Sequence, residues 1–136
     1  MRITSRTFGV VVDTSGSMSA KQIGMALGSI ASYAAAKDVP FVRIIFCDAK
    51  ATDAGYLAPE DIAGRVKVTG RGGTILQPGV DCLEQANDFP KDGPILIITD
   101  GEIENDLKVR REHAFLLPRG NRLPFRTRGE VFYFRE

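Results

Sequence analysis

Short apolar runs bounded by Asp, Gly or Pro recur along the sequence, and they predict the strands of a sheet. They are rich in β-branched and aromatic residues, and runs of this kind are typical of buried parallel strands. The run at 95–99 is the most apolar, so we expect it at the centre of the sheet. We predict strands at residues 8–12, 41–47, 95–99, 114–117 and 131–134, the last at the end of the sheet, and an edge strand at 54–57.

Apolar residues at helical spacing follow the first predicted strand. Ser19 is a suitable N-cap, and Ile23, Leu27 and Ile30 recur on one face of a helix that we expect to reach about Lys37. Its two glycines each cost about 1 kcal/mol relative to Ala, so packing against the sheet must stabilise it. We predict further helices from Pro59 to about Arg65 and across 78–87, and a short or irregular helix across 102–112.

The alternation of strands and helices predicts an α/β fold with a doubly wound, Rossmann-like and mostly parallel sheet flanked by helices. A chain of 136 residues suits one domain, so we interpret residues 1–136 as a single domain. The first strand begins within eight residues of Met1. With so few residues before the first strand, the chain could be a complete protein or a segment from the C-terminal part of a longer one.

The composition is that of an ordinary folded domain. It is 43% hydrophobic and 26% charged with a net charge of +1, so bulk charge neither recruits nor excludes polyanions. No apolar stretch approaches the roughly 18 to 20 residues of a membrane span, and the N-terminus lacks a signal-peptide pattern. We therefore expect a cytoplasmic protein without membrane contact. Cys47 and Cys82 have no metal-type spacing, and we expect reduced, buried thiols.

Two predicted strands are each followed by an acid, Asp13 in one case and Asp100 in the other. If the sheet is parallel, both carboxylates emerge at the same edge, where ligands bind in open α/β sheets. Ser15 and Ser17 follow Asp13, and Gly16 between them permits a tight turn that aims two hydroxyls at one point. An all-oxygen set without His or Cys suits Mg²⁺, Mn²⁺ or Ca²⁺ rather than zinc or copper.

The stretch from Asp13 to Ser17 has the Asp-x-Ser-x-Ser form of the metal-ion-dependent adhesion site (MIDAS) in von Willebrand factor A (VWA) domains. Gly73-Thr74 and Thr99-Asp100-Gly101 follow in the order that this family has, so the resemblance spans nearly the whole chain. It implies a VWA-like fold with Ser15, Ser17 and Thr74 as hydroxyl ligands of the metal. It also implies that Asp13 and Asp100 act through water or alternate with Thr74.

In that family the metal keeps one open coordination position, which an acidic side chain of a partner protein fills. The resemblance therefore implies metal-bridged protein binding without catalysis, although a larger parent protein could be enzymatic. Ile75 stands where many relatives have Asp or Asn, and the segment after Asp100 is short. The chain thus looks like the small bacterial cytoplasmic type of VWA domain. For that type the expected partner is an AAA-type ATPase or the rest of a longer parent chain.

Two other interpretations compete with a metal-dependent adhesion site. Asp13, Ser15 and Ser17 could be an ordinary helix-capping turn, since Asp and Ser are common there. Alternatively, a Mg²⁺-dependent phosphotransferase or phosphatase could use Asp13 as a nucleophile at a strand end. Against that enzyme, Thr14-Ser15 replaces the second acid that such a nucleophile needs two residues later. Binding remains our prediction, with the enzyme as the alternative.

The remaining charges favour neither catalysis nor nucleic-acid binding. His113 has no acid and nucleophile near it in sequence, so we expect it to pack or cap near the strand at 114–117. Residues 81–106 are rich in acids and 108–128 in Arg and Lys, a pattern that indicates two solvated faces or a basic rim that recruits an acidic partner. Without interleaved stacking aromatics, nucleic acid is an improbable ligand.

Overall fold

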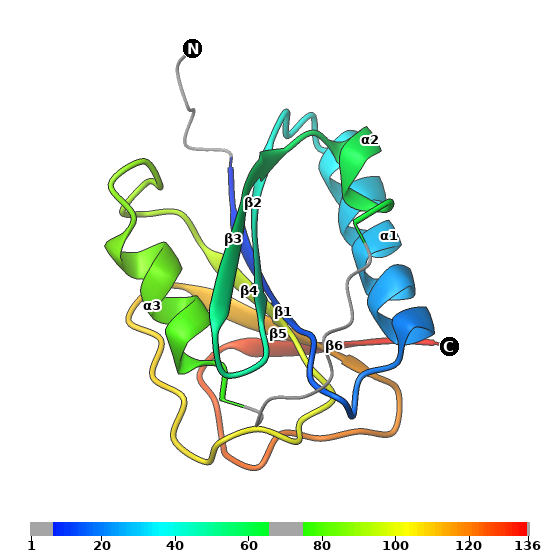
Figure 1. Ribbon diagram of the computed structural model, residues 1–136, viewed down its shortest axis with the longest axis vertical. Coiled ribbons are helices and arrows are strands. Elements are labelled where there is room, and N and C mark those ends of the chain that lie inside the picture. Colours follow the sequence, from blue (N-terminus) through cyan, green and yellow to red (C-terminus); the bar gives the residue numbers. More distant parts are fainter. Residues whose placement is uncertain (1–6, 66–74, 136) are drawn as a thin grey trace.

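A computed structural model describes residues 7–65 and 75–135, and within them six strands form one sheet. The strand order is β3-β2-β1-β4-β5-β6; β2 and β3 are antiparallel, and all the other neighbours are parallel (Figure 1). The predicted mostly parallel α/β fold is therefore confirmed. The strands are β1 (Gly9–Asp13), β2 (Val42–Cys47), β3 (Ala51–Leu57), β4 (Ile95–Ile98), β5 (His113–Pro118) and β6 (Glu130–Phe134); the helices are α1 (Ala20–Ala36), α2 (Pro59–Ile62) and α3 (Gln77–Gln85).

The two strands that precede the acids lie side by side at the centre of the sheet. Val10 of β1 pairs with Leu96 of β4, and every residue of β1 is buried. The central position of the 95–99 run and the terminal position of the 131–134 run are thus as predicted. This arrangement brings the carboxyl ends of β1 and β4 to the same edge of the sheet.

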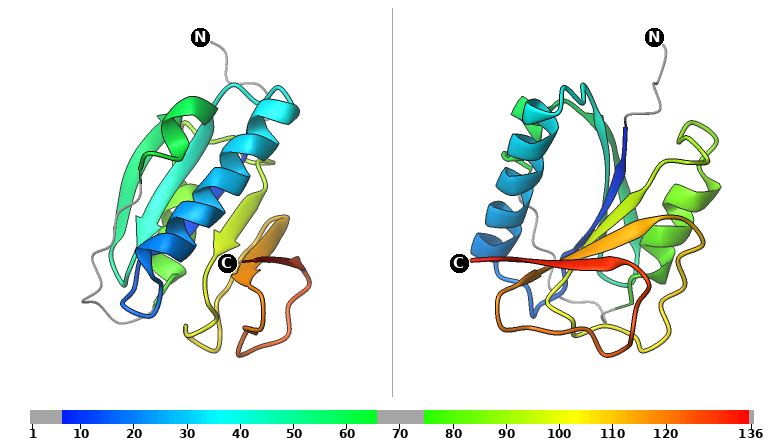
Figure 2. Two further views of the ribbon diagram at one scale, coloured as in Figure 1. Left: turned by 90° about the vertical axis from the view of Figure 1, so that its right-hand side faces the viewer. Right: turned by 180° about the vertical axis from the view of Figure 1, so that it is seen from behind.

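Helices cover the sheet from both sides. Helix α1 lies with α2 against one face, and α3 lies against the other (Figures 1 and 2). The start of α1 is fixed by a capping box: the Ser19 hydroxyl accepts from the Gln22 backbone N–H at 3.0 Å, and the Gln22 side chain accepts from the Ser19 N–H at 3.1 Å. The predicted N-cap is confirmed. Because β-strand side chains alternate, Val10 and Val12 face the α1 core while Val11 faces the α3 core.

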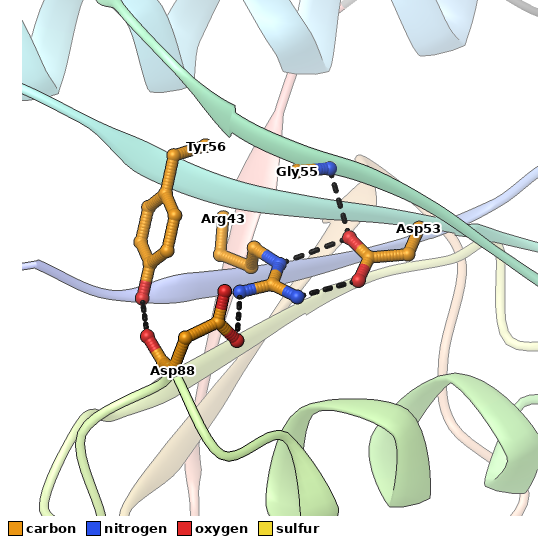
Figure 3. A network of polar contacts seen from close by, with 5 residues as sticks. All are labelled: Arg43, Asp53, Gly55, Tyr56 and Asp88. Atoms are coloured by element: carbon orange, nitrogen blue, oxygen red, sulfur yellow. Dashed lines mark hydrogen bonds and ion pairs between the residues drawn. The ribbon is translucent and has the colours of Figure 1, made fainter.

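A buried arginine on β2 joins three parts of the α3 side (Figure 3). The Arg43 guanidinium donates to both carboxylate oxygens of Asp53 on β3, at 2.9 and 2.5 Å, and to Asp88 after α3 at 2.7 Å. It also lies 5.0 Å from the centre of the Tyr56 ring, whose hydroxyl donates to the Asp88 carbonyl. Arg43 lowers the pKa of Asp53, and these carboxylates raise the pKa of Arg43. The buried guanidinium charge is therefore compensated within this cluster.

Several predicted boundaries were wrong. The helix expected across 102–112 does not form; this segment is irregular, with short turns and bends. Its backbone groups bond to distant side chains instead, since the Lys108 N–H donates to Gln77 and the Arg110 N–H donates to Glu84. Strand β3 begins at Ala51 rather than at Ala54, and α2 ends at Ile62 rather than near Arg65. Both cysteines are free thiols, but only Cys47 is buried, whereas Cys82 is half-buried.

Candidate metal-binding site

The two predicted carboxylates lie at the carboxyl ends of the two central strands. Asp13 is the last residue of β1, and Asp100 comes two residues after the end of β4. Both are buried, with 0% and 4% of their surface exposed. Parallel strands that are hydrogen-bonded neighbours end at the same edge, so the sequence-based expectation that these residues meet follows from the observed pairing.

Neutral donors hold the Asp13 carboxylate. One oxygen accepts from the Ser15 backbone N–H at 2.9 Å, and the other accepts from the Thr99 hydroxyl at 2.7 Å. The Thr99 oxygen in turn accepts from the Gly101 N–H at 3.1 Å, so this threonine links the ends of β1 and β4. Thr99 belongs to the Thr99-Asp100-Gly101 motif, but no role was predicted for it from the sequence. Its position directly before Asp100 is the sequence feature that could have indicated one.

The surroundings of Asp13 disfavour the ionised form of its side chain. Burial is the main factor that raises its pKa above the ordinary 3.8, and the negative charge of Asp100 raises it further. Hydrogen bonds from Ser15 and Thr99 oppose this rise without cancelling it. Within 7–65 and 75–135, the ion pairs belong to Arg43, and neither Asp13 nor Asp100 has a cationic partner. A bound divalent cation would favour the ionised carboxylate of Asp13.

The serines of the motif form a compact turn. The hydroxyl oxygens of Ser15 and Ser17 lie 3.1 Å apart, with Ser15 buried and Ser17 exposed. The Met18 N–H donates to the Ser15 carbonyl at 3.0 Å, and the buried Met18 side chain anchors the turn in the α1 core. Asp13, Ser15 and Ser17 are thus brought together, whereas Thr74 lies outside the described residues.

The donors in this region fit a hard divalent cation. They are carboxylate and hydroxyl oxygens, which suit Mg²⁺, Mn²⁺ or Ca²⁺. In the described part of the chain, no three His, Cys, Asp or Glu side chains form a group that could hold a metal ion. A site here therefore depends on serine hydroxyls as well as on two carboxylates.

The Asp100 loop is braced by the segment between β5 and β6. The Asp100 side chain accepts from the Glu102 N–H at 3.0 Å, and its carbonyl accepts from the Asn121 side chain at 2.9 Å. Gly101 has a φ of 92°, and a Cβ at this position would lie 2.0 Å from the Arg122 carbonyl oxygen. Only glycine fits this turn, so its presence after Asp100 has a direct steric cause.

Glu104 is a functional candidate that sequence analysis missed. Helix α3 begins after Leu76, whose own side chain gives no cap. Instead, the Glu104 carboxylate accepts from the Leu76 N–H at 2.9 and 3.0 Å and from the Gln77 N–H at 2.9 Å. This carboxylate therefore ties the Asp100 loop to the residues that closely follow Thr74 in the sequence. The 27- and 28-residue separations of these bonds left no local signal.

His113 lies away from these residues, at the amino end of β5. One ring nitrogen is 2.8 Å from the Arg111 carbonyl and the other is 3.3 Å from the Thr127 hydroxyl, while the ring meets Phe115 edge-on. This packing role is the one predicted for it. Arg111 also turns inward, where it donates to the Pro90 and Gly93 carbonyls. The idea that the acidic and basic segments form only solvated faces is therefore incorrect for Arg111.

Comparison with known proteins identifies a family for the chain. Residues 8–111, from the approach to β1 through the Asp100 loop, match the family model described as a VWA-like domain (DUF2201). The chain belongs to this family. The VWA-like domain also resembles in fold a solved structure of an aerotolerance-related membrane protein from Bacteroides fragilis that carries multiple mutations to serine. The TM-score is 0.66 and the identity is 16%, over 87% of this chain and 71% of that chain.

Two further comparisons give negative results. The search of curated proteins returned no match. Among the described residues of this VWA-like domain, no helix has both the length and the apolar character needed to cross a membrane.

Proposed function

We propose that this VWA-like domain is a divalent-metal-dependent protein-interaction module with a MIDAS-type site at Asp13, Ser15, Ser17, Thr74 and Asp100. One observation carries the proposal. Two buried carboxylates lie at the ends of neighbouring parallel strands, and only neutral groups within the described chain stabilise them. Two serine hydroxyls that lie 3.1 Å apart in the same loop complete a set suited to Mg²⁺.

The chemistry of this set supports binding. Two carboxylates formally neutralise a divalent ion, while neutral hydroxyls leave it electrophilic. An Asp or Glu side chain of a partner protein would then complete its coordination. Ser15 and Thr99 orient the Asp13 carboxylate, and Glu102 and Asn121 hold the Asp100 loop. These hydrogen bonds fix the Asp13 carboxylate and the Asp100 loop at the same edge of the sheet.

We also propose that the domain has no catalytic activity, functions in the cytoplasm, and takes its acidic ligand from an AAA-type ATPase or from another part of a longer parent chain. The arrangement of possible proton carriers supports a binding role. The ring of His113 is engaged at the amino end of β5, whereas Asp13 stands at the carboxyl end of β1. A phosphatase using Asp13 would need a proton donor near that carboxylate, and besides the Asp100 carboxylate the described residues supply only hydroxyls and amides there.

The direct test is metal-dependent thermal stability. A ligand that binds only the folded state at 100 times its Kd adds about 2.7 kcal/mol, so Mn²⁺ or Mg²⁺ should raise the Tm of the wild-type chain clearly. Asp13→Ala should abolish this rise, and Ser17→Ala should reduce it. Asp92→Ala, in the exposed turn before β4, is the matched control and should leave it unchanged. An equal metal response in Asp13→Ala would exclude the proposed site.

A second arm separates binding from catalysis. A column carrying the domain should retain a Glu-rich peptide in Mg²⁺ and release it in chelator, whereas the matched Gln peptide should not be retained. Generic phosphate esters should not be hydrolysed. Metal-dependent hydrolysis that disappears in Asp13→Asn would favour the enzyme instead.

A further inference from the structure

One half of the sheet carries an open apolar groove beside α1. Helices α1 and α2 lie over β1, β2 and β3 on this face, whereas no helix of the described chain lies in front of β4 and β5 (Figure 2, left). The groove has a volume of about 600 Å³. Its floor comes mainly from β4, β5 and β6, and its wall comes from α1. The apolar side chains lining it include Phe8, Ile30, Tyr33, Leu96, Leu116 and Phe132.

Three of these side chains, Tyr33, Leu96 and Phe132, are more exposed than apolar side chains at such positions usually are, whereas Ile30 and Leu116 are buried. Leu96 is on a central strand, between β1 and β5, yet it is only partly buried while Ile95, Ile97 and Ile98 are fully buried. Tyr33 and Phe132 are 55% and 49% exposed and face the groove from opposite sides. Parallel sheets normally have both faces covered, so this face is structurally incomplete.

Charge around the groove is one-sided. Glu112 and Glu130, both exposed, lie at the starts of β5 and β6, and no Lys or Arg lines the groove within the described ranges. The only other titratable side chain besides Tyr33 is His113, whose ring nitrogens are near Thr127 and the Arg111 carbonyl. The acidic end is at the amino ends of the strands, opposite Asp13 and Asp100. A groove ligand therefore leaves the metal-binding edge free.

We propose that this groove binds an amphipathic helix of a partner protein, with its apolar face on Leu96, Leu116 and Phe132 and basic residues beside Glu112 and Glu130. A helix laid beside α1 would complete the layer over the sheet at the usual helix–helix spacing. Anchors at i, i+3 or i+4 and i+7 match an open apolar groove. The two glutamates attract Lys and Arg, and they also favour the positive amino end of a helix.

Two labelled helical peptides of equal length test this proposal with the full chain in chelator, where the metal site cannot contribute. Both carry the same leucine face, and their flanks are Lys in one and Glu in the other. The Lys peptide should bind at least tenfold more tightly by fluorescence anisotropy. Phe132→Asp should weaken it tenfold or more, whereas Tyr133→Asp should not. Tyr133 is the matched control, because it is adjacent on the same strand, faces the other way and is 53% exposed.

Charge reversal provides an independent readout. The double variant Glu112→Lys with Glu130→Lys should bind the Glu peptide in preference to the Lys peptide. Circular dichroism of each variant should match the wild type, which separates lost binding from lost folding. Equal losses in Phe132→Asp and Tyr133→Asp, or no binding of either peptide, would overturn the proposal. A concentration-dependent dimer that Phe132→Asp dissociates would assign the groove to a second copy of the chain and would also overturn it.

Discussion

Two buried charged residues, Arg43 and Asp13, lie at opposite ends of the sheet, and their charges are stabilised in different ways. Around Arg43, one guanidinium meets the carboxylates of Asp53 and Asp88, and the pKa of Asp53 is lowered (Figure 3). Around Asp13, the neighbouring charge is the like charge of Asp100, and the pKa is raised. In the first cluster, carboxylates of the chain compensate the buried guanidinium. In the second, only hydroxyls and amides bind the buried carboxylate, so a bound cation would be needed to compensate its charge.

The difference between the two clusters indicates that Arg43 has a structural role and that Asp13 has a functional one. Breaking a compensated buried ion pair leaves an unpaired charge and is strongly destabilising. An uncompensated carboxylate that is kept buried costs stability, and such costs are typical of sites that bind or react. The two clusters should therefore respond in opposite ways to mutation, metal and pH.

The largest effect is expected at Arg43. Arg43→Ala removes the buried guanidinium together with its three charge-assisted hydrogen bonds and its contact with the Tyr56 ring, for which we expect a loss of about 3 kcal/mol in the free energy of unfolding. The carboxylates left behind can be solvated, because the Asp53 and Asp88 side chains are 33% and 66% exposed. Urea unfolding measures the change. Arg119→Ala, which alters an exposed side chain, is the control and should change stability by less than about 0.5 kcal/mol.

Metal removal should have the next largest effect, and only on the Asp13 cluster. Chelator should reduce the free energy of unfolding of the Mg²⁺-loaded wild type by about 2.7 kcal/mol when the metal was present at 100 times its Kd. Chelator should reduce the free energy of unfolding of Arg43→Ala by the same amount, because Arg43 lies at the opposite end of the sheet from the proposed metal site. Differential scanning calorimetry with and without chelator measures both proteins. A much smaller increment in Arg43→Ala would mean that the clusters are coupled and that the contrast is too simple.

Glu104 offers a smaller and more specific test. Glu104→Gln keeps the shape of the cap on α3 but removes its charge, and we expect a loss of about 1 kcal/mol, within the range for helix caps. If the cap also positions the segment after Thr74, Mn²⁺ affinity should fall severalfold. Titration followed by electron paramagnetic resonance measures that affinity. Glu102→Gln, an exposed acid in the same loop, should change neither quantity. Unchanged Mn²⁺ affinity in Glu104→Gln would limit Glu104 to a structural role.

The features that sequence reasoning predicted are those encoded locally. Apolar runs identified β1 and β4, and the acid after each strand placed Asp13 and Asp100 at one edge once the sheet was parallel. The Ser19 cap was predictable because its partner is three residues away. The bonds of Arg43 and Glu104 connect residues 10 to 45 positions apart, so no local pattern signals them. The helix predicted at 102–112 was wrong for the same reason, because distant side chains accept hydrogen bonds from the backbone of this segment.

In chelator, the pH dependence of stability should show that Asp13 and Asp53 contribute to it with opposite signs. Asp13 has a raised pKa in the folded state, so its ionised form destabilises the fold at neutral pH, and this penalty disappears as pH falls through that raised pKa towards the ordinary 3.8. Asp53 has a lowered pKa, so its stabilising contribution is complete above 3.8 and is lost as pH falls below it.

Stability should therefore rise on mild acidification and then fall in stronger acid. Asp13→Asn should remove the rise and keep the fall, whereas Arg43→Ala should keep the rise and flatten the fall. Thermal unfolding at pH steps from 7 to 3, with Asp92→Asn as a control for an exposed acid, measures both limbs. A rise that persists in Asp13→Asn would contradict the view that this carboxylate is the uncompensated charge. If Mg²⁺ binds the ionised carboxylate as proposed, added Mg²⁺ should also abolish the rise in the wild type, and this result would link the electrostatic penalty to the proposed binding function.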